Sequence, residues 1–126
     1  MGDRGQVRFI YSDYSGHAEP REVWFYTHWG ASVLWECVAS ALARGKGRWD
    51  DEEYLARIIF CEMVGNDVEG TTGFGIGMSR HGDVWQVITV NAEQQTVTVE
   101  KPPIGPVSFD VFATGGIRLL AEVRDA

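Results

Sequence analysis

Residues 23–30 read VWFYTHWG, and they indicate how the chain passes from a strand into its first helix. The stretch starts with β-branched and aromatic residues, which favour an extended strand, and it ends at a glycine ahead of a helical pattern. Four aromatic rings and one imidazole fall within it. Rings beside hydrogen-bond donors form a stacking surface for planar ligands, but a buried strand that ends in a tight turn has the same composition. The stretch predicts a strand-to-helix corner and leaves open whether its rings bind a ligand or fill the core.

A hairpin and two helices are predicted around this corner. Residues 6–12 alternate loosely between apolar and polar, and we expect them to pair with residues 21–27. Residues 31–44 place their apolar side chains on one side of a helix, which Gly45 ends. Residues 50–64 open with an acidic run suited to a helix start and are then apolar almost all round. This second helix should therefore be the most buried element.

The second half of the chain predicts mainly strands. Residues 73–78 alternate glycine with apolar residues, which is typical of a strand with one bare face. Residues 84–90 and 95–101 predict two further strands, and we expect the three to form a meander. Residues 108–113 predict one short helical turn, and residues 117–123 fit a strand and a helix equally.

Length and composition indicate one domain. A chain of 126 residues, 44% hydrophobic and 23% charged, can bury one hydrophobic core without metal or disulfide support. No linker or repeat divides it. We therefore predict a single α+β domain over residues 1–126. Its antiparallel sheet, an N-terminal hairpin plus a three-strand meander, packs against the two consecutive helices.

Charge and cysteine content exclude several classes of partner. The net charge is −7 and the chain holds only two lysines, whereas duplex nucleic acid requires clustered basic residues. No apolar run approaches the roughly 20 residues that span a bilayer, and the first residues lack a secretion leader. Cys37 and Cys61 fall inside predicted helices without metal-ligand spacing. We expect a cytoplasmic protein with free thiols, no metal or cofactor, and no membrane or duplex partner.

Several side chains together could bind a nucleotide-like ligand, which needs rings that stack on its base and donors for its phosphates. The corner supplies the rings, and arginines and threonines farther along the chain supply the donors. We expect the ligand-binding residues to be Trp24, Tyr26, His28, Trp29, Arg57, Glu62, Thr71, Thr72 and Arg80.

Glu62 has two interpretations. It falls on the same predicted helix face as Leu55 and Ile58, where a carboxylate is costly unless it is paired. It therefore either has a structural partner elsewhere in the fold or lies at the mouth of a cavity. In the second case it could serve, with His28, in the acid–base chemistry of a small hydrolase.

Three segments carry a family resemblance. Residues 26–30 (YTHWG), 54–63 (YLARIIFCEM) and 72–76 (TGFGI) resemble a family of short uncharacterised proteins from bacteriophage and bacterial genomes. The resemblance covers residues 20–100, and residues 31–32 and 77–78 depart from the family pattern. It implies a small, phage-encoded intracellular accessory protein. By analogy, such proteins counter host defence by sequestering a nucleotide signal or by blocking a protein.

Three functional hypotheses follow. The first is a non-enzymatic protein that sequesters a small nucleotide-derived signalling ligand in a bacterial host. It would be a homo-oligomer, because five tryptophans exceed what one small core requires. The second is an acidic protein-binding inhibitor of a host defence factor. The third is the small hydrolase that uses Glu62 and His28.

Overall fold

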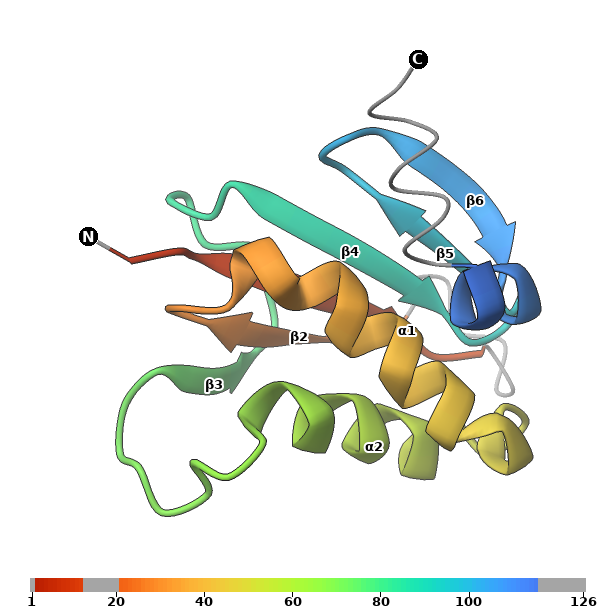
Figure 1. Cartoon of the computed structure of the whole chain (residues 1–126), viewed down its shortest axis with the longest axis horizontal. Helices are drawn as coiled ribbons and strands as arrows, with labels where there is room; N and C mark the ends of the chain where they lie inside the picture. The colour runs from red at the N-terminus through yellow and green to blue at the C-terminus, as the bar shows by residue number, and fades with distance from the viewer. Residues whose placement is uncertain (1, 13–20, 116–126) are drawn as a thin grey trace.

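The computed structural model describes residues 2–12 and 21–115, and its α+β class is the predicted one (Figure 1). Six strands form one sheet: β1 (Gly5–Ile10), β2 (Glu22–Thr27), β3 (Phe74–Gly77), β4 (Gln86–Asn91), β5 (Thr96–Val99) and β6 (Ile104–Ser108). Between β2 and β3 lie the helices α1 (Leu34–Arg44) and α2 (Glu52–Val64), preceded by single 3-10 turns at Ala31–Val33 and Lys46–Arg48. Residues 109–115 are helical as well.

The strand order is β3-β2-β1-β4-β5-β6, and every neighbouring pair is antiparallel except β1 with β4. The predicted hairpin of β1 and β2 is present. The meander consists of β4, β5 and β6, whereas β3 lies beyond β2 at the opposite edge. The expected pairing of residues 73–78 with residues 84–90 is therefore absent. Chain order could not show this, because α1 and α2 return the chain to the free edge of β2 before β3 begins.

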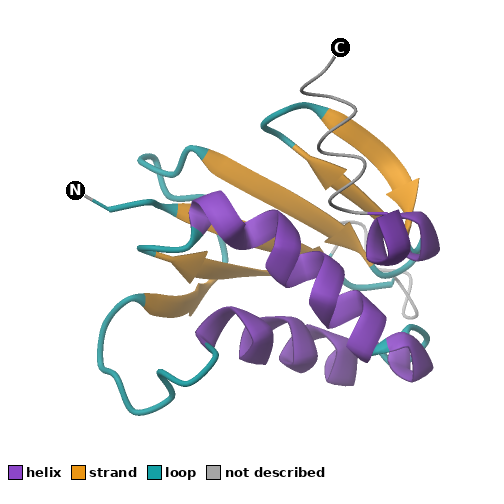
Figure 2. Ribbon diagram, viewed as in Figure 1, coloured by secondary structure: helices purple, strands orange, loops and turns teal. Residues whose placement is uncertain are grey.

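Both helices cover the same face of the sheet (Figure 2). Because successive side chains of a strand point to opposite faces of the sheet, every second side chain lies on this face and packs against helix residues. The fully buried residues of this core include Val7, Phe9, Ile88, Leu55 and Ile59. The helix at residues 109–115 closes one end of the same core, since Phe109 and Phe112 are also buried in it.

The opposite face is covered by the connection from β3 to β4. Its Val84 packs against Trp24 and Val87 in a second, smaller apolar cluster. The side chain of Gln6, 1% exposed, holds the connection in place. Its amide nitrogen donates to the carbonyl of Ser79, and its amide oxygen accepts from the main-chain nitrogen of His81.

The prediction that the second helix is the most buried element is wrong. In α2, Tyr54, Arg57 and Cys61 are exposed and Phe60 is only partly buried. The reason is that α2 packs against the sheet and α1 on one side only, so its outer apolar residues stay at the surface. Within residues 2–12 and 21–115, no helix combines the length and hydropathy that a membrane span requires.

Candidate functional site

The aromatic residues of the corner divide between the two faces of the sheet. Trp24, 7% exposed, belongs to the cluster away from the helices, and the partly buried Tyr26 packs against that cluster. His28 contacts Tyr26 through a hydrogen bond of 3.1 Å. Trp29 lies instead beside the helices and is 55% exposed. Because side chains alternate along an extended chain, the four expected residues do not form one stacking surface.

Contacts with the start of β3 hold Trp29 in place. Its ring lies against Gly73 so closely that a Cβ atom there would come within 2.1 Å of the Trp29 Cζ3 atom. The main-chain nitrogen of His28 donates to the carbonyl of Gly73 at 2.8 Å. The Thr27 hydroxyl accepts from the main-chain nitrogen of Gly30 at 3.0 Å. The corner therefore presents the Trp29 ring at the surface in one orientation.

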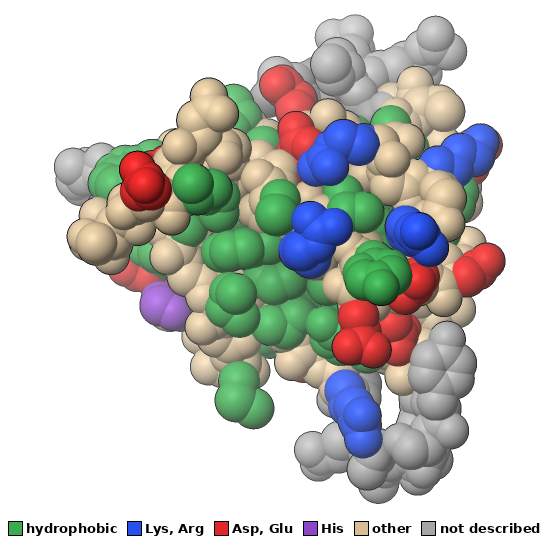
Figure 3. Space-filling view, turned by 90° about the horizontal axis from the view of Figure 1, so that it is seen from below, with side chains coloured by type: hydrophobic (Ala, Val, Ile, Leu, Met, Phe, Trp, Pro, Cys, Tyr) green, Lys and Arg blue, Asp and Glu red, His purple; other side chains and the backbone are tan. Residues whose placement is uncertain are grey.

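The Trp29 ring lines an inner pocket, which shares Phe74 with an outer pocket, and we call the two pockets together the groove. The inner pocket, about 170 Å³, is lined by Thr27, Trp29, Gly30, Val33, Leu34, Cys37, Met63 and Phe74. The outer pocket, about 550 Å³, is lined by Phe60, Cys61, Val64, Gly65, Asp67, Val68, Gly70, Thr72 and Phe74. Phe74 lines both. Seen from below, hydrophobic side chains gather across this part of the surface (Figure 3).

The groove is lined mainly by apolar side chains and offers few ionisable groups. Burial raises the pKa of the Cys37 thiol, and the carboxylates of Glu62 and Glu36 raise it further, so this sulfur stays protonated. The outer pocket offers the Thr72 hydroxyl and the Asp67 carboxylate as its side-chain polar groups. No group of three or more metal-binding side chains occurs in the part of the chain that the structure describes.

Three of the expected phosphate donors lie at or near the outer pocket. Thr72 lines it, and the exposed Thr71 directly precedes Thr72. Arg57 lies at its rim, because its Nη1 atom is 3.8 Å from the sulfur of Cys61, which lines the pocket. With Trp29, the structure thus brings one expected ring and these donors to the groove.

Glu62 has a structural partner. Its carboxylate accepts from Arg44 of α1 at 2.9 Å and from the Ser40 hydroxyl at 3.3 Å. His28 accepts at Nδ1 from Arg4 at 3.3 Å. No hydrogen bond joins His28 to Glu62 among the described residues. Because Arg44 on the neighbouring helix pairs with it, the Glu62 carboxylate can lie on this helix face without the cost of an unpaired charge.

Arg80 is engaged elsewhere. It lies in the connection between β3 and β4, and its two terminal nitrogens donate to both carboxylate oxygens of Glu100 at 2.7 and 2.8 Å. Arg80 therefore does not reach the groove. These hydrogen bonds, together with the positive charge of Arg80, hold the pKa of Glu100 below its ordinary value.

Replacing Arg80 by methionine should lower the free energy of unfolding by no more than about 1 kcal/mol at neutral pH, because both partners are exposed. The folded-state pKa of Glu100 is depressed, so this contribution is present above the unfolded pKa and is lost as the pH falls through the folded pKa. Urea denaturation should show the difference from wild type shrinking in acidic buffer. A difference that is constant with pH would contradict this account.

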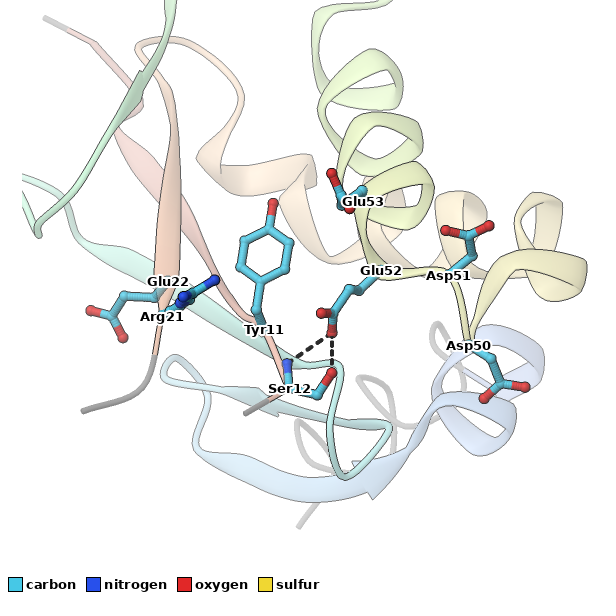
Figure 4. A pocket seen from close by; sticks show the side chains of 8 residues that line it. All are labelled: Tyr11, Ser12, Arg21, Glu22, Asp50, Asp51, Glu52 and Glu53. Atoms are coloured by element: carbon cyan, nitrogen blue, oxygen red, sulfur yellow. Dashed lines mark hydrogen bonds between the residues drawn. The ribbon is translucent and has the colours of Figure 1, made fainter. Parts of the chain in front are cut away.

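A third pocket, about 490 Å³, lies at the start of α2 (Figure 4). Glu52 accepts there from the main-chain nitrogen and the hydroxyl of Ser12 at 2.8 and 2.5 Å. Burial raises the pKa of the Tyr11 hydroxyl, and the carboxylates of Glu53 and Glu52 add to the shift. The pocket is lined by Tyr11, Ser12, Arg21, Glu22, Asp50, Asp51, Glu52 and Glu53. So many carboxylates make it unsuited to an anionic ligand.

Sequence reasoning missed most of the groove. Phe60, Val64, Val68 and Phe74 were not among the expected ligand-binding residues, although they line the outer pocket. Two signals were available: Phe60 lies off the main apolar stripe of its helix, and Val68 is an isolated apolar residue in a polar loop. In the structure Phe60 is partly buried and Val68 is exposed, and both line the outer pocket.

Comparison of the chain with protein-family models, with curated proteins and with solved structures finds no significant match. The functional assignment therefore depends on the geometry of the groove.

Proposed function

We propose that the protein is a non-catalytic binding protein whose groove holds a small, planar and weakly charged ligand of the nucleoside or cyclic-nucleotide type. The observation that carries the proposal is the exposed Trp29 ring in the wall of a pocket of about 170 Å³, which shares Phe74 with a second pocket of about 550 Å³. The larger volume is in the range of small-molecule sites, which spans roughly 300–1,000 Å³. Apolar walls with a few polar groups are typical of such sites.

The charges around the groove limit the ligand. Arg57 at the rim and the hydroxyl of Thr72 can hold one phosphate group. The Asp67 carboxylate in the wall and the net charge of −7 oppose several phosphates. This balance favours a nucleoside or a ligand with a single phosphate charge over a nucleoside triphosphate.

The proposed role is sequestration of a nucleotide-derived signal in a bacterial host, as the resemblance to phage accessory proteins implies. Binding without turnover is supported by two features of the described residues. Glu62 and His28 form no hydrogen bond with each other, and the Cys37 thiol in the inner pocket has a raised pKa. Such a protein would act by stoichiometric removal of its ligand.

Replacing Trp29 by alanine should weaken ligand binding about 5- to 150-fold, because stacking of a base on an aromatic ring contributes roughly 1–3 kcal/mol. Titration calorimetry with adenosine, cyclic AMP and ADP-ribose measures this directly. Trp85→Ala is the matched control, since Trp85 is an exposed tryptophan outside the groove. Equal affinity in the Trp29 variant, or no heat with any of these ligands, would refute the proposal.

A further inference from the structure

Within residues 2–12 and 21–115, the outer edge of β3 has no paired strand. β3 is terminal in the sheet order, and its one neighbour among these residues is β2 (Figure 1). The hydrogen bond from His28 to the carbonyl of Gly73 makes those two residues a hydrogen-bonded pair. Because such pairs alternate along an antiparallel ladder, Gly75 also points its main-chain groups toward β2. Phe74 and Ile76 therefore point their N–H and C=O groups outward.

This edge lacks the features that normally protect edge strands. Residues 70–79 contain no charged residue and no proline. The opposite edge is formed by β6, which holds Pro106 and so lacks one main-chain donor. On β3, Ile76 is 64% exposed, and Met78 just after it is 86% exposed. Exposed apolar residues on an open, uncharged edge indicate that another strand pairs with it.

We propose that β3 pairs with β3 of a second copy, antiparallel about a two-fold axis at Gly75. In this register Phe74 lies opposite Ile76 of the second copy, and Ile76 lies opposite its Phe74. These are the residues whose main-chain groups point outward, so both pairs form two hydrogen bonds each. Gly75 faces Gly75 across the axis, with their Cα atoms about 4.5 Å apart.

A second copy fits this edge because the edge is self-complementary. The side chains of Phe74 and Ile76 face the helix side, so in the dimer each Phe74 meets an Ile76 on that side. Without charges on the edge, the two acidic chains meet where their mutual repulsion is weakest. Ile76 of the second copy also extends the wall of the groove at Phe74, which lines both pockets. The dimer itself does not depend on the identity of the ligand.

Light scattering coupled to size-exclusion chromatography tests the association. Wild type should have twice the 14.0 kDa mass of the chain, and Ile76→Lys should have the mass of one chain. Val111→Lys is the matched control, because Val111 is 45% exposed in the helix at residues 109–115, and it should stay dimeric. Circular dichroism should show the same fold for all three. A monomeric wild type, or a dimer that persists in Ile76→Lys, would overturn the proposal.

Cysteine cross-linking tests the register, in a background with Cys37→Ala and Cys61→Ser. A side chain at Gly75 or Gly77 meets no atom within 4 Å, so both positions accept cysteine. Gly75→Cys should form an interchain disulfide on mild oxidation, because its Cα separation of about 4.5 Å is in the bonding range. In the Gly77→Cys variant, the two introduced cysteines are offset along the strands by four residues, or roughly 13 Å. They should therefore not cross-link. Equal cross-linking of both variants, or of neither, would exclude this arrangement.

Discussion

Replacing Phe112 by alanine is expected to lower the free energy of unfolding by about 3–5 kcal/mol, as is usual for a fully buried phenylalanine. Phe112 is 0% exposed, and its ring stacks on Trp35 of α1 with 5.3 Å between ring centroids. The neighbouring Phe109 is also buried and lies edge-on to Trp49 at 5.5 Å. Truncation at Phe112 would open a cavity between α1 and the helix at residues 109–115.

Urea denaturation measures this loss as a lower transition midpoint with an unchanged slope. Val111→Ala is the control, because Val111 is in the same helix and 45% exposed. It should change the free energy of unfolding by no more than about 0.5 kcal/mol. If the two variants lose equal stability, the helix at residues 109–115 does not contribute to the core as described.

Replacing Gly73 by alanine is expected to lower the free energy of unfolding by about 2–4 kcal/mol, from backbone strain and a steric clash together. Gly73 has a φ of +96°, which side chains with a Cβ atom rarely adopt. The added methyl group would lie 2.1 Å from the Trp29 ring, so the ring must move. Because Trp29 forms one wall of the groove, ligand binding should weaken in the same variant.

Thermal or urea denaturation checks the stability change, and tryptophan fluorescence reports movement of the indole ring. Gly75→Ala is the comparison, since a Cβ atom there meets nothing within 4 Å and its φ is not positive. It should be as stable as wild type or slightly more stable. If Gly73→Ala behaves like Gly75→Ala, Trp29 does not pack against Gly73 as described.

The local elements could be predicted because their signals lie close together in the sequence. The helix predicted over residues 31–44 is found as a 3-10 turn followed by α1, and the one predicted over 50–64 is found at Glu52–Val64. The β1–β2 hairpin is also confirmed. The edge on which β3 lies could not be predicted, since the alternation of its residues fits any antiparallel neighbour equally well.

The site was only partly predictable for a related reason. Trp29, Thr72 and Arg57 were expected and lie at the groove. Arg80 was expected as a donor, but it pairs with Glu100, a residue that only the fold brings near it. A residue type predicts what a side chain can bind, whereas its actual partner depends on which elements pack together.

The order of residues along the chain was enough to establish the α+β class, the strand-to-helix corner at residues 23–30 and the net charge of −7. These properties follow from composition and from side-chain patterns that repeat every two residues in a strand or every 3.6 residues in a helix. Such patterns involve only residues that are close together in the sequence. The division of the corner rings between two sheet faces, the groove and the open edge of β3 arose only when distant segments packed. Packing involves contacts among residues far apart in the chain, and no local pattern specifies them.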